Sequence, residues 1–183
     1  SRNTLINVEG RYAKIHGIIN ISNQYNGQQN NNVFSYNYSF IRDLEVVANQ
    51  EQEFIINIES KSNIEYQFNN LTIYVNNHLD KIFNFNIENG TVILNNIVIQ
   101  SNLDFTLKYC FQISRIKKLI IKNSTLLGDD LIKINDVNSE IIITNCYIDC
   151  QKLSGDNLIL YNNIIKDTDG SKRILIDKRN RFI

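Results

Sequence analysis

The sequence predicts an all-β chain folded as a parallel β-helix, a solenoid of about six to seven coils. The first observation is a repeat, apolar–x–apolar–x–Asn–x–x–apolar, which recurs along most of the 183 residues. The second is the spacing of its anchor residues, which are 27, 26, 27, 22 and 17 residues apart. Short alternating strands at such a spacing are typical of solenoids, whose turns are stable only against their neighbours. The anchors are Asp43, Asn70, Asn96, Asn123, Asn145 and Asn162.

Each repeat is expected to contribute three short strands. Strand side chains alternate, so the apolar residues four and two positions before each anchor should point inward. The residue three positions after the anchor forms a second inward row, made of Val46, Ile73, Ile99, Leu126, Ile148 and Ile165. A separate strand precedes most anchors, within residues 56–58, 83–85, 111–113 and 132–134. Equivalent strands then stack in parallel sheets, and helices should be scarce.

The asparagine position has a physical explanation. We expect these side chains to turn inward at a corner, where an amide can bond the corner backbone and the asparagine of the next coil. The pattern resembles the right-handed parallel β-helices of the pectin-lyase-like superfamily, in particular its tailspike and adhesin members, and it covers residues 14–176. The resemblance implies a right-handed single-stranded helix with an asparagine ladder. We expect one domain over 1–183, with residues 1–13 as an N-terminal cap and 177–183 as a basic C-terminal tail.

Composition excludes several classes of function. The 19 basic and 19 acidic residues cancel, so no general attraction to nucleic acid or to an anionic membrane is expected. No apolar run approaches the ~20 residues of a membrane span, and the polar start is not that of a signal peptide. We expect an extracellular, cell-surface or virion protein whose signal or neighbouring domains are not in this chain. The three cysteines fit buried thiols, with a Cys146–Cys150 bridge left open.

Acidic residues recur shortly after the anchors, at one corner of the predicted coil. Carboxylates from successive coils can bind Ca²⁺ or act as acid and base on a glycosidic bond, although Asp is also a common turn residue. We expect no other cofactor. Gly128-Asp129-Asp130 resembles the Gly-Asp-Asp segment of polygalacturonase-type glycoside hydrolases, which implies Asp129 and Asp130 as acid and base. Asp104 stands one coil upstream, where that family has Asn-Thr-Asp, and the family's His-Gly is missing. A lyase would need a basic residue, for which Lys108, Arg115 and Lys133 are candidates.

Two apolar surfaces are predicted. Tyr36, Tyr38 and Phe40 share one face of a strand, which points outward if Ile41 points inward, and exposed aromatic rings can stack on sugars. The alternative is that other parts of the chain cover this face. The position three before the anchor should also point outward, and four consecutive coils place isoleucine there. An apolar ridge of this kind marks a packing surface, and by analogy with tailspikes we expect a homotrimer. The ridge consists of Ile93, Ile120, Ile142 and Ile159.

These features favour a non-catalytic module of a viral (phage) or microbial surface protein, used for attachment to a polysaccharide or cell-surface glycan. One alternative is a polysaccharide-degrading hydrolase or lyase acting through Asp104, Asp129 and Asp130. Another is a purely structural assembly protein in which only the isoleucine ridge matters.

Overall fold

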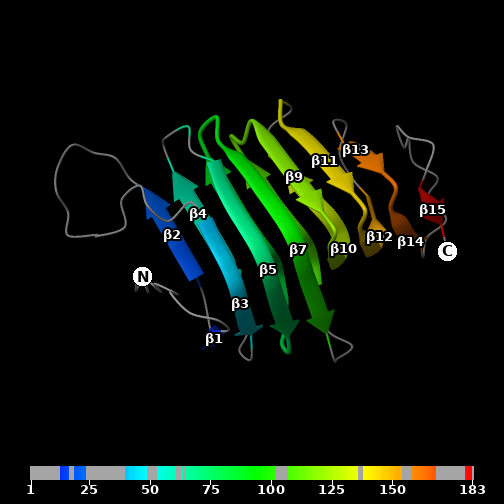
Figure 1. The fold of residues 1–183 in the computed structure, drawn as a ribbon, viewed down its shortest axis with the longest axis horizontal. Coiled ribbons are helices and arrows are strands. Elements are labelled where there is room, and N and C mark those ends of the chain that lie inside the picture. Colours follow the sequence, from blue (N-terminus) through cyan, green and yellow to red (C-terminus); the bar gives the residue numbers. More distant parts are fainter. Residues whose placement is uncertain are drawn as a thin grey trace.

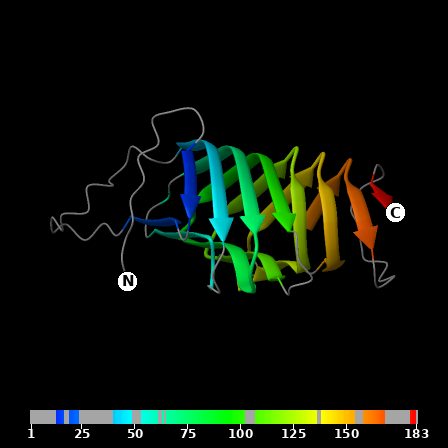
Figure 2. The same cartoon turned by 90° about the horizontal axis from the view of Figure 1, so that it is seen from below.

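The computed structural model describes residues 13–16, 19–23, 40–48, 53–60, 63, 65–101, 107–135, 138–153, 158–167 and 180–182. Over these residues the chain is a parallel β-solenoid, built from strands joined by turns and bends. Figure 2 shows the strands stacked along the long axis, from the blue strands at one end to the red strand at the other. No helix long and apolar enough to cross a membrane occurs among the described residues.

Three sheets form the sides of the solenoid, and we call them Sheets I, II and III (Figure 1). Every strand pair within them is parallel. Sheet I contains the first parts of β3 (Phe40–Ala48), β5 (Glu65–Val75) and β7 (Thr91–Ser101), then β9 (Lys118–Lys122), β11 (Glu140–Thr144) and β13 (Leu158–Tyr161). Sheet II contains β1 (Ala13–His16), the second parts of β3, β5 and β7, the first part of β10 (Thr125–Ile134), then β12 (Tyr147–Lys152), β14 (Ile164–Asp167) and β15 (Arg181–Phe182). Sheet III contains β2 (Ile19–Asn23), β4 (Ile56–Ser60), β6 (Leu79–Ile87), β8 (Leu107–Ser114) and the last part of β10.

The solenoid has about four complete three-sided turns, fewer than the six to seven coils expected. The difference arises at the last step, where the repeat shortens to 17 residues. The 22-residue repeat from Asn123 to Asn145 still includes the part of β10 that lies on Sheet III. Beyond β10, the described strands β11 to β15 continue Sheets I and II, and Lys152 at the end of β12 pairs with Asp130. Within the described residues, the 17-residue repeat therefore adds a rung to two sheets without a strand of its own on the third.

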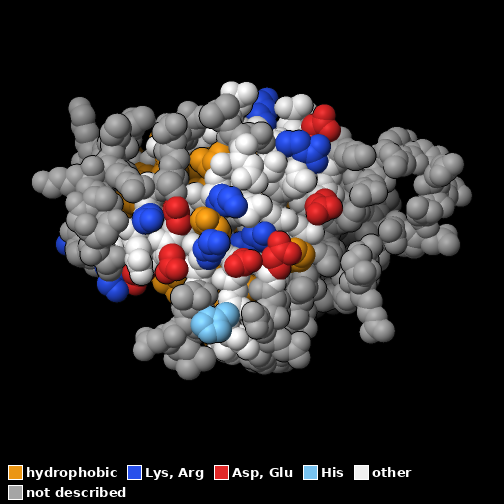
Figure 3. All heavy atoms as spheres, turned by 180° about the vertical axis from the view of Figure 1, so that it is seen from behind, with side chains coloured by type: hydrophobic (Ala, Val, Ile, Leu, Met, Phe, Trp, Pro, Cys, Tyr) orange, Lys and Arg blue, Asp and Glu red, His pale blue; other side chains and the backbone are white. Residues whose placement is uncertain are grey.

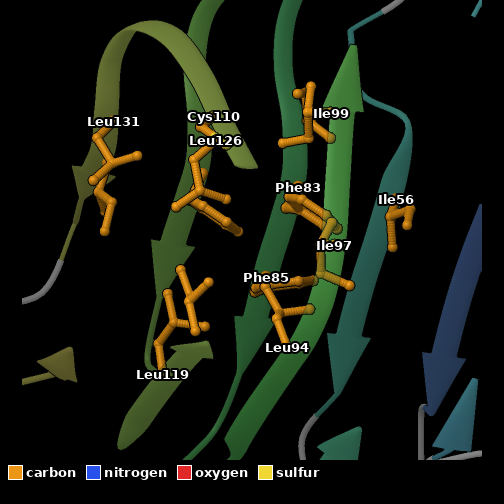
Figure 4. Close-up of a cluster of buried hydrophobic side chains, with 14 of the residues drawn as sticks. Ile56, Phe83, Phe85, Leu94, Ile97, Ile99, Cys110, Leu119, Leu126 and Leu131 are labelled. Atoms are coloured by element: carbon orange, nitrogen blue, oxygen red, sulfur yellow. The ribbon is translucent and has the colours of Figure 1, made fainter. Parts of the chain in front are cut away.

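The predicted inward rows form the core. The apolar pairs before the five Asn anchors are at most 7 % exposed, and the row three residues after the anchors is at most 1 % exposed. On Sheet III the phenylalanines stack between coils, with the rings of Phe83 and Phe111 4.8 Å apart and 8° from parallel. Figure 4 shows Phe83 and Phe85 directed into this core beside Leu94 and Ile97. The dry interior is the main stabilising element of such a stack, because apolar burial drives folding.

The asparagine ladder is confirmed, but its predicted inward orientation is wrong. Asp43 and all five Asn anchors have positive φ, between 54° and 57°, and the Asn side chains are exposed. Asparagine is one of the few residues that adopts this left-handed conformation readily. The outer ladder runs along the corner between Sheets I and II through bonds from Nδ2 to Oδ1: Asn70 to Asp43 at 2.9 Å, Asn96 to Asn70 at 2.8 Å, Asn123 to Asn95 at 2.8 Å, Asn145 to Asn123 at 3.4 Å and Asn162 to Asn145 at 2.6 Å.

A second, inner ladder occupies the position directly after the anchor in the later coils. This position is apolar at Leu71 and Ile97 but becomes Ser124, Cys146 and Asn163, and Asn180 lies 17 residues beyond Asn163. Asn163 is 1 % exposed. Its Oδ1 accepts from the backbone N of Cys146 at 2.8 Å, and its Nδ2 donates to the carbonyl of Ile143 at 2.9 Å. Asn180 repeats both bonds one coil later, with Asn163 N and Leu160 O. Buried amides thus bridge neighbouring coils, one residue away from where they were expected.

Candidate ligand-binding face

The structure places the predicted site residues unevenly. Asp104, Tyr36 and Tyr38 lie outside the described residues, as does the side chain of Phe40, whose backbone pairs with Gln67 in Sheet I. The predicted isoleucine ridge is one continuous row on the outer face of Sheet I, in direct register across four strands. Each side chain in it is only half-buried. Stacking along the row covers part of every isoleucine, so the ridge is less exposed than the sequence alone indicated.

Asp129 and Asp130 lie where β10 turns from Sheet II into Sheet III. The turn is made at Gly128, whose φ is 157°, and a Cβ there would stand 3.1 Å from the backbone N of Cys110. From Thr125 to Gly128, β10 pairs with β12. Asp130, after the turn, pairs with Lys152 of β12 on one side and with Tyr109 of β8 on the other. Both carboxylates are half-buried. Glycine is favoured here because a Cβ would force the neighbouring backbone to shift and because side chains rarely adopt this φ.

The acidic corner also contains Asp149, which pairs with Leu127 one coil away. Its Oδ2 accepts from Lys166 Nζ at 3.0 Å, and this hydrogen bond raises the pKa of Lys166. Burial raises the pKa of the nearby Cys150 thiol, and the charges of Asp149, Asp130 and Asp129 raise it further. Among the described residues, no group of three or more His, Cys, Asp or Glu side chains is placed to hold a metal ion. The Ca²⁺ prediction stays untested, since Asp104 lies outside them.

The outer face of Sheet III carries two adjoining rows of polar side chains. One row, in register across four strands, is Asn57, Asn84, Gln112 and Lys133. The backbone pairs Lys81–Tyr109 and Tyr109–Asp130 form the neighbouring row. Figure 3, which shows the side opposite to that of Figure 1, has acidic and basic side chains intermingled near its centre.

Hydrogen bonds hold these side chains in place. Asn84 Nδ2 donates to Asn57 Oδ1 at 2.7 Å. Lys81, whose side chain is only 8 % exposed, places Nζ 2.7 Å from Glu53 Oε1 and 3.3 Å from Gln112 Oε1. Burying an ammonium group is unfavourable unless it is paired and hydrogen-bonded, and these two oxygen atoms supply that pairing. The two rows are therefore cross-linked into one prearranged surface, which we call the Sheet III face.

Tyr109 is the aromatic member of the Sheet III face. It is half-buried, and the ammonium groups of Lys108 and Lys133 lie 5.6 Å and 5.4 Å from its ring centroid. Both distances are within the range of cation–π attraction. The third lyase candidate, Arg115, lies at the other end of β8. It is a corner residue with φ 57°, and its Nε donates to Asn86 Oδ1 at 2.8 Å. Arg115 therefore has a structural contact of its own.

Sequence reasoning missed Tyr109 for an identifiable reason. Strict alternation from the inward Phe111 puts Tyr109 on the inside. Instead Cys110 and Phe111 are both fully buried and Tyr109 is half-exposed. The same step occurs in β6, where Ile82 and Phe83 are both buried. The sequence did contain a signal for this. Both β6 and β8 have two consecutive apolar residues at the same register position, just before the segment in which side chains alternate.

The three cysteines are free and buried. Cys146 and Cys150 are four residues apart along one extended segment, so their Cα atoms are roughly 13 Å apart. A disulfide needs less than about 7 Å, which removes the bridge that the sequence left open. Burial raises the pKa of Cys146 to about 11, and burial also raises that of Cys110.

Comparison with known proteins adds no assignment. No protein-family model matches the chain, and no curated protein or solved structure matches it. The solenoid fold therefore rests on the structure itself, and any function must be argued from the Sheet III face.

Proposed function

We propose that this chain is a non-catalytic attachment module that binds an extended carbohydrate on the Sheet III face. The observation that carries the proposal is the pair of adjoining polar rows, in which hydrogen bonds join Asn84 to Asn57 and Lys81 to Glu53 and Gln112, beside one tyrosine that two ammonium groups contact. Carbohydrates present many hydroxyl groups, each able to donate and accept. Amide and carboxylate side chains answer both needs, and a prearranged surface loses little side-chain entropy on binding.

The repeat of the fold supports an extended ligand. Strands of Sheet III follow one another at about 4.8 Å, so a row such as Asn57 to Lys133 offers a similar group once per coil over about 14 Å. A linear polymer can use such a row residue by residue, whereas a compact small molecule could reach only part of it. This points to attachment along a chain of sugars.

The test is direct binding to a glycan array, followed by affinity measurements on variants. Tyr109→Ala and Asn84→Ala should each weaken binding by about tenfold, the loss expected from one good contact. The matched control is Tyr74→Ala, because Tyr74 is also a half-buried tyrosine but belongs to the β5 part of Sheet II. Equal affinity of the Tyr109 variant and the wild type would remove the proposal, as would the absence of binding to any glycan.

An enzymatic function is the second candidate, because Asp130 lies in the same face as Tyr109 and Lys133. Two carboxylates can divide acid and base roles in glycoside hydrolysis. The variant Asp129→Asn with Asp130→Asn separates the two functions. Turnover of a bound glycan by the wild type, lost in this variant, would replace the attachment proposal by a hydrolase or lyase.

We also propose that the isoleucine ridge on Sheet I contacts other copies of the chain. Four half-buried isoleucines in one row give an apolar strip bordered by charged groups, among them the ion pair of Lys118 and Glu140 at 2.8 Å. A trimer would have about three times the 21.3 kDa of one chain. Light scattering on the eluted protein tests this, and a monomer that stays monomeric at high concentration would rule it out.

A further inference from the structure

We infer that Lys108, Tyr109 and Lys133 form a cradle for an anionic group of the bound glycan, and this inference rests on the proposed carbohydrate binding. Three lysines of the described chain have a carboxylate oxygen within 3.0 Å: Lys81 with Glu53, Lys118 with Glu140 and Lys166 with Asp149. Lys108 and Lys133 differ. Both are exposed, and among the described residues neither has a carboxylate within ion-pair distance. Their contact is with one tyrosine ring.

The geometry brings two positive charges to one place. The ammonium groups come from neighbouring coils, on β8 and β10, and lie 5.6 Å and 5.4 Å from the same ring centroid, so at most about 11 Å separates them. Like charges repel at this range. The tyrosine ring offsets part of that repulsion through its negative face. An anion that reaches both ammonium groups would offset the rest, so this position favours a negative group.

The surrounding groups define what kind of anion fits. Asp130 pairs with Tyr109, and Asp129 precedes it. Gln112 is the register partner of Lys133 and accepts from Lys81. These carboxylate and amide oxygens accept hydrogen bonds from hydroxyl groups but repel a second anion. The ligand that satisfies both conditions is a sugar bearing one anionic substituent beside free hydroxyls. The charged substituent is a carboxylate or a sulfate ester, which share this chemistry.

The experiment measures affinity for three hexasaccharides of equal length: hyaluronan, whose charges are all carboxylates, a heparin fragment, which carries sulfates in addition to carboxylates, and neutral maltohexaose. The wild type should bind at least one anionic probe about tenfold more tightly than the neutral one, with the difference shrinking as salt screens it. Lys108→Gln with Lys133→Gln should remove this preference, because it lowers the affinity for the anionic probe much more than the affinity for the neutral one. Lys108→Arg with Lys133→Arg should keep it, because the charge is retained. Lys122→Gln, an exposed lysine on Sheet I, is the control.

The outcomes separate this inference from the function on which it rests. Equal affinity for anionic and neutral probes, or an unchanged anionic preference in the Lys→Gln variant, overturns the cradle while carbohydrate binding stands. Binding to none of the probes and to no glycan of the array overturns both. Binding of the heparin fragment but not of hyaluronan then assigns the anion as a sulfate, whereas binding of hyaluronan assigns it as a carboxylate.

Discussion

Two consecutive asparagines on β7 provide a sharp test of why asparagine stands at the corner. Asn96 Nδ2 donates to Asn70 Oδ1 at 2.8 Å, and Asn95 Nδ2 donates to Asn69 Oδ1 at 3.1 Å. Both therefore take part in contacts between coils. They differ in backbone conformation, because Asn96 has φ 57° whereas Asn95 is not among the residues with positive φ. We predict that Ala and Gly substitutions rank in opposite order at the two positions.

The magnitudes follow from backbone preference. Either substitution removes side-chain bonds that contribute about 0.5–1.5 kcal/mol each, so that loss cancels when Ala and Gly are compared at one site. At Asn96 the left-handed conformation costs alanine about 1–2 kcal/mol and costs glycine nothing. Glycine loses about 0.5–1 kcal/mol through the entropy of the unfolded chain. Asn96→Gly should therefore be about 0.5–1 kcal/mol more stable than Asn96→Ala. At Asn95 glycine should be less stable than alanine by a similar amount.

The assay is urea unfolding, monitored by circular dichroism. The free energies of the four variants are compared only if their unfolding transitions have the same slope against urea concentration. Equal slopes matter because a solenoid can unfold in parts, which makes a single free energy undefined. If alanine is as stable as glycine at Asn96, the corner does not need the left-handed conformation and the side-chain bonds alone explain the asparagine. If glycine is favoured at both positions, local flexibility rather than the corner is responsible.

Three further predictions concern the interior. Asn163→Ala should lower the free energy of unfolding by about 2–3 kcal/mol, measured in urea, because it removes two buried bonds between coils. Gly128→Ala should cost about 1–3 kcal/mol in the same assay, since its Cβ would stand 3.1 Å from a backbone atom. The raised thiol pKa values predict stability that is full below the unfolded thiol pKa of 9.0 and falls as pH rises from there toward 11, where Cys146 ionises in the folded state. The slope should reach about 1.4 kcal/mol per pH unit for each thiol that ionises on unfolding, and Cys146→Ala should make it shallower.

Most of the fold could be predicted because the core follows a period of two. The inward rows at Val46 to Ile165 and the Phe-rich strands of Sheet III lie where alternation places them. The number of full turns could not be predicted, because a repeat of 17 residues keeps the anchor pattern although its described residues include no strand of their own on Sheet III. The anchor repeat identifies each strand of Sheets I and II. It contains no residue that indicates whether a strand of Sheet III follows.

The orientation of the ladder was open to prediction and was misjudged. Residues such as Leu94 and Ile99 are both inward although five positions apart, an odd number that strict alternation forbids. One residue between them must leave the extended conformation. Asparagine tolerates the left-handed region, so Asn96 is that residue, and the reversal turns its side chain outward and its successor Ile97 inward. The same reversal explains why the inner ladder begins one position later, at Ser124.

The shortening of the repeat also shapes the proposed site. Sheets I and II continue through β13 and β14, whereas the last described strand of Sheet III is the end of β10. The outer row of Sheet III thus reads amide, amide, amide and ammonium, from Asn57 and Asn84 through Gln112 to Lys133. A glycan lying along this row would place neutral sugars over the amides and its anionic group at the last rung, beside Tyr109. If the proposed binding holds, a polymer that is anionic at one end is therefore expected to lie in one direction along the row.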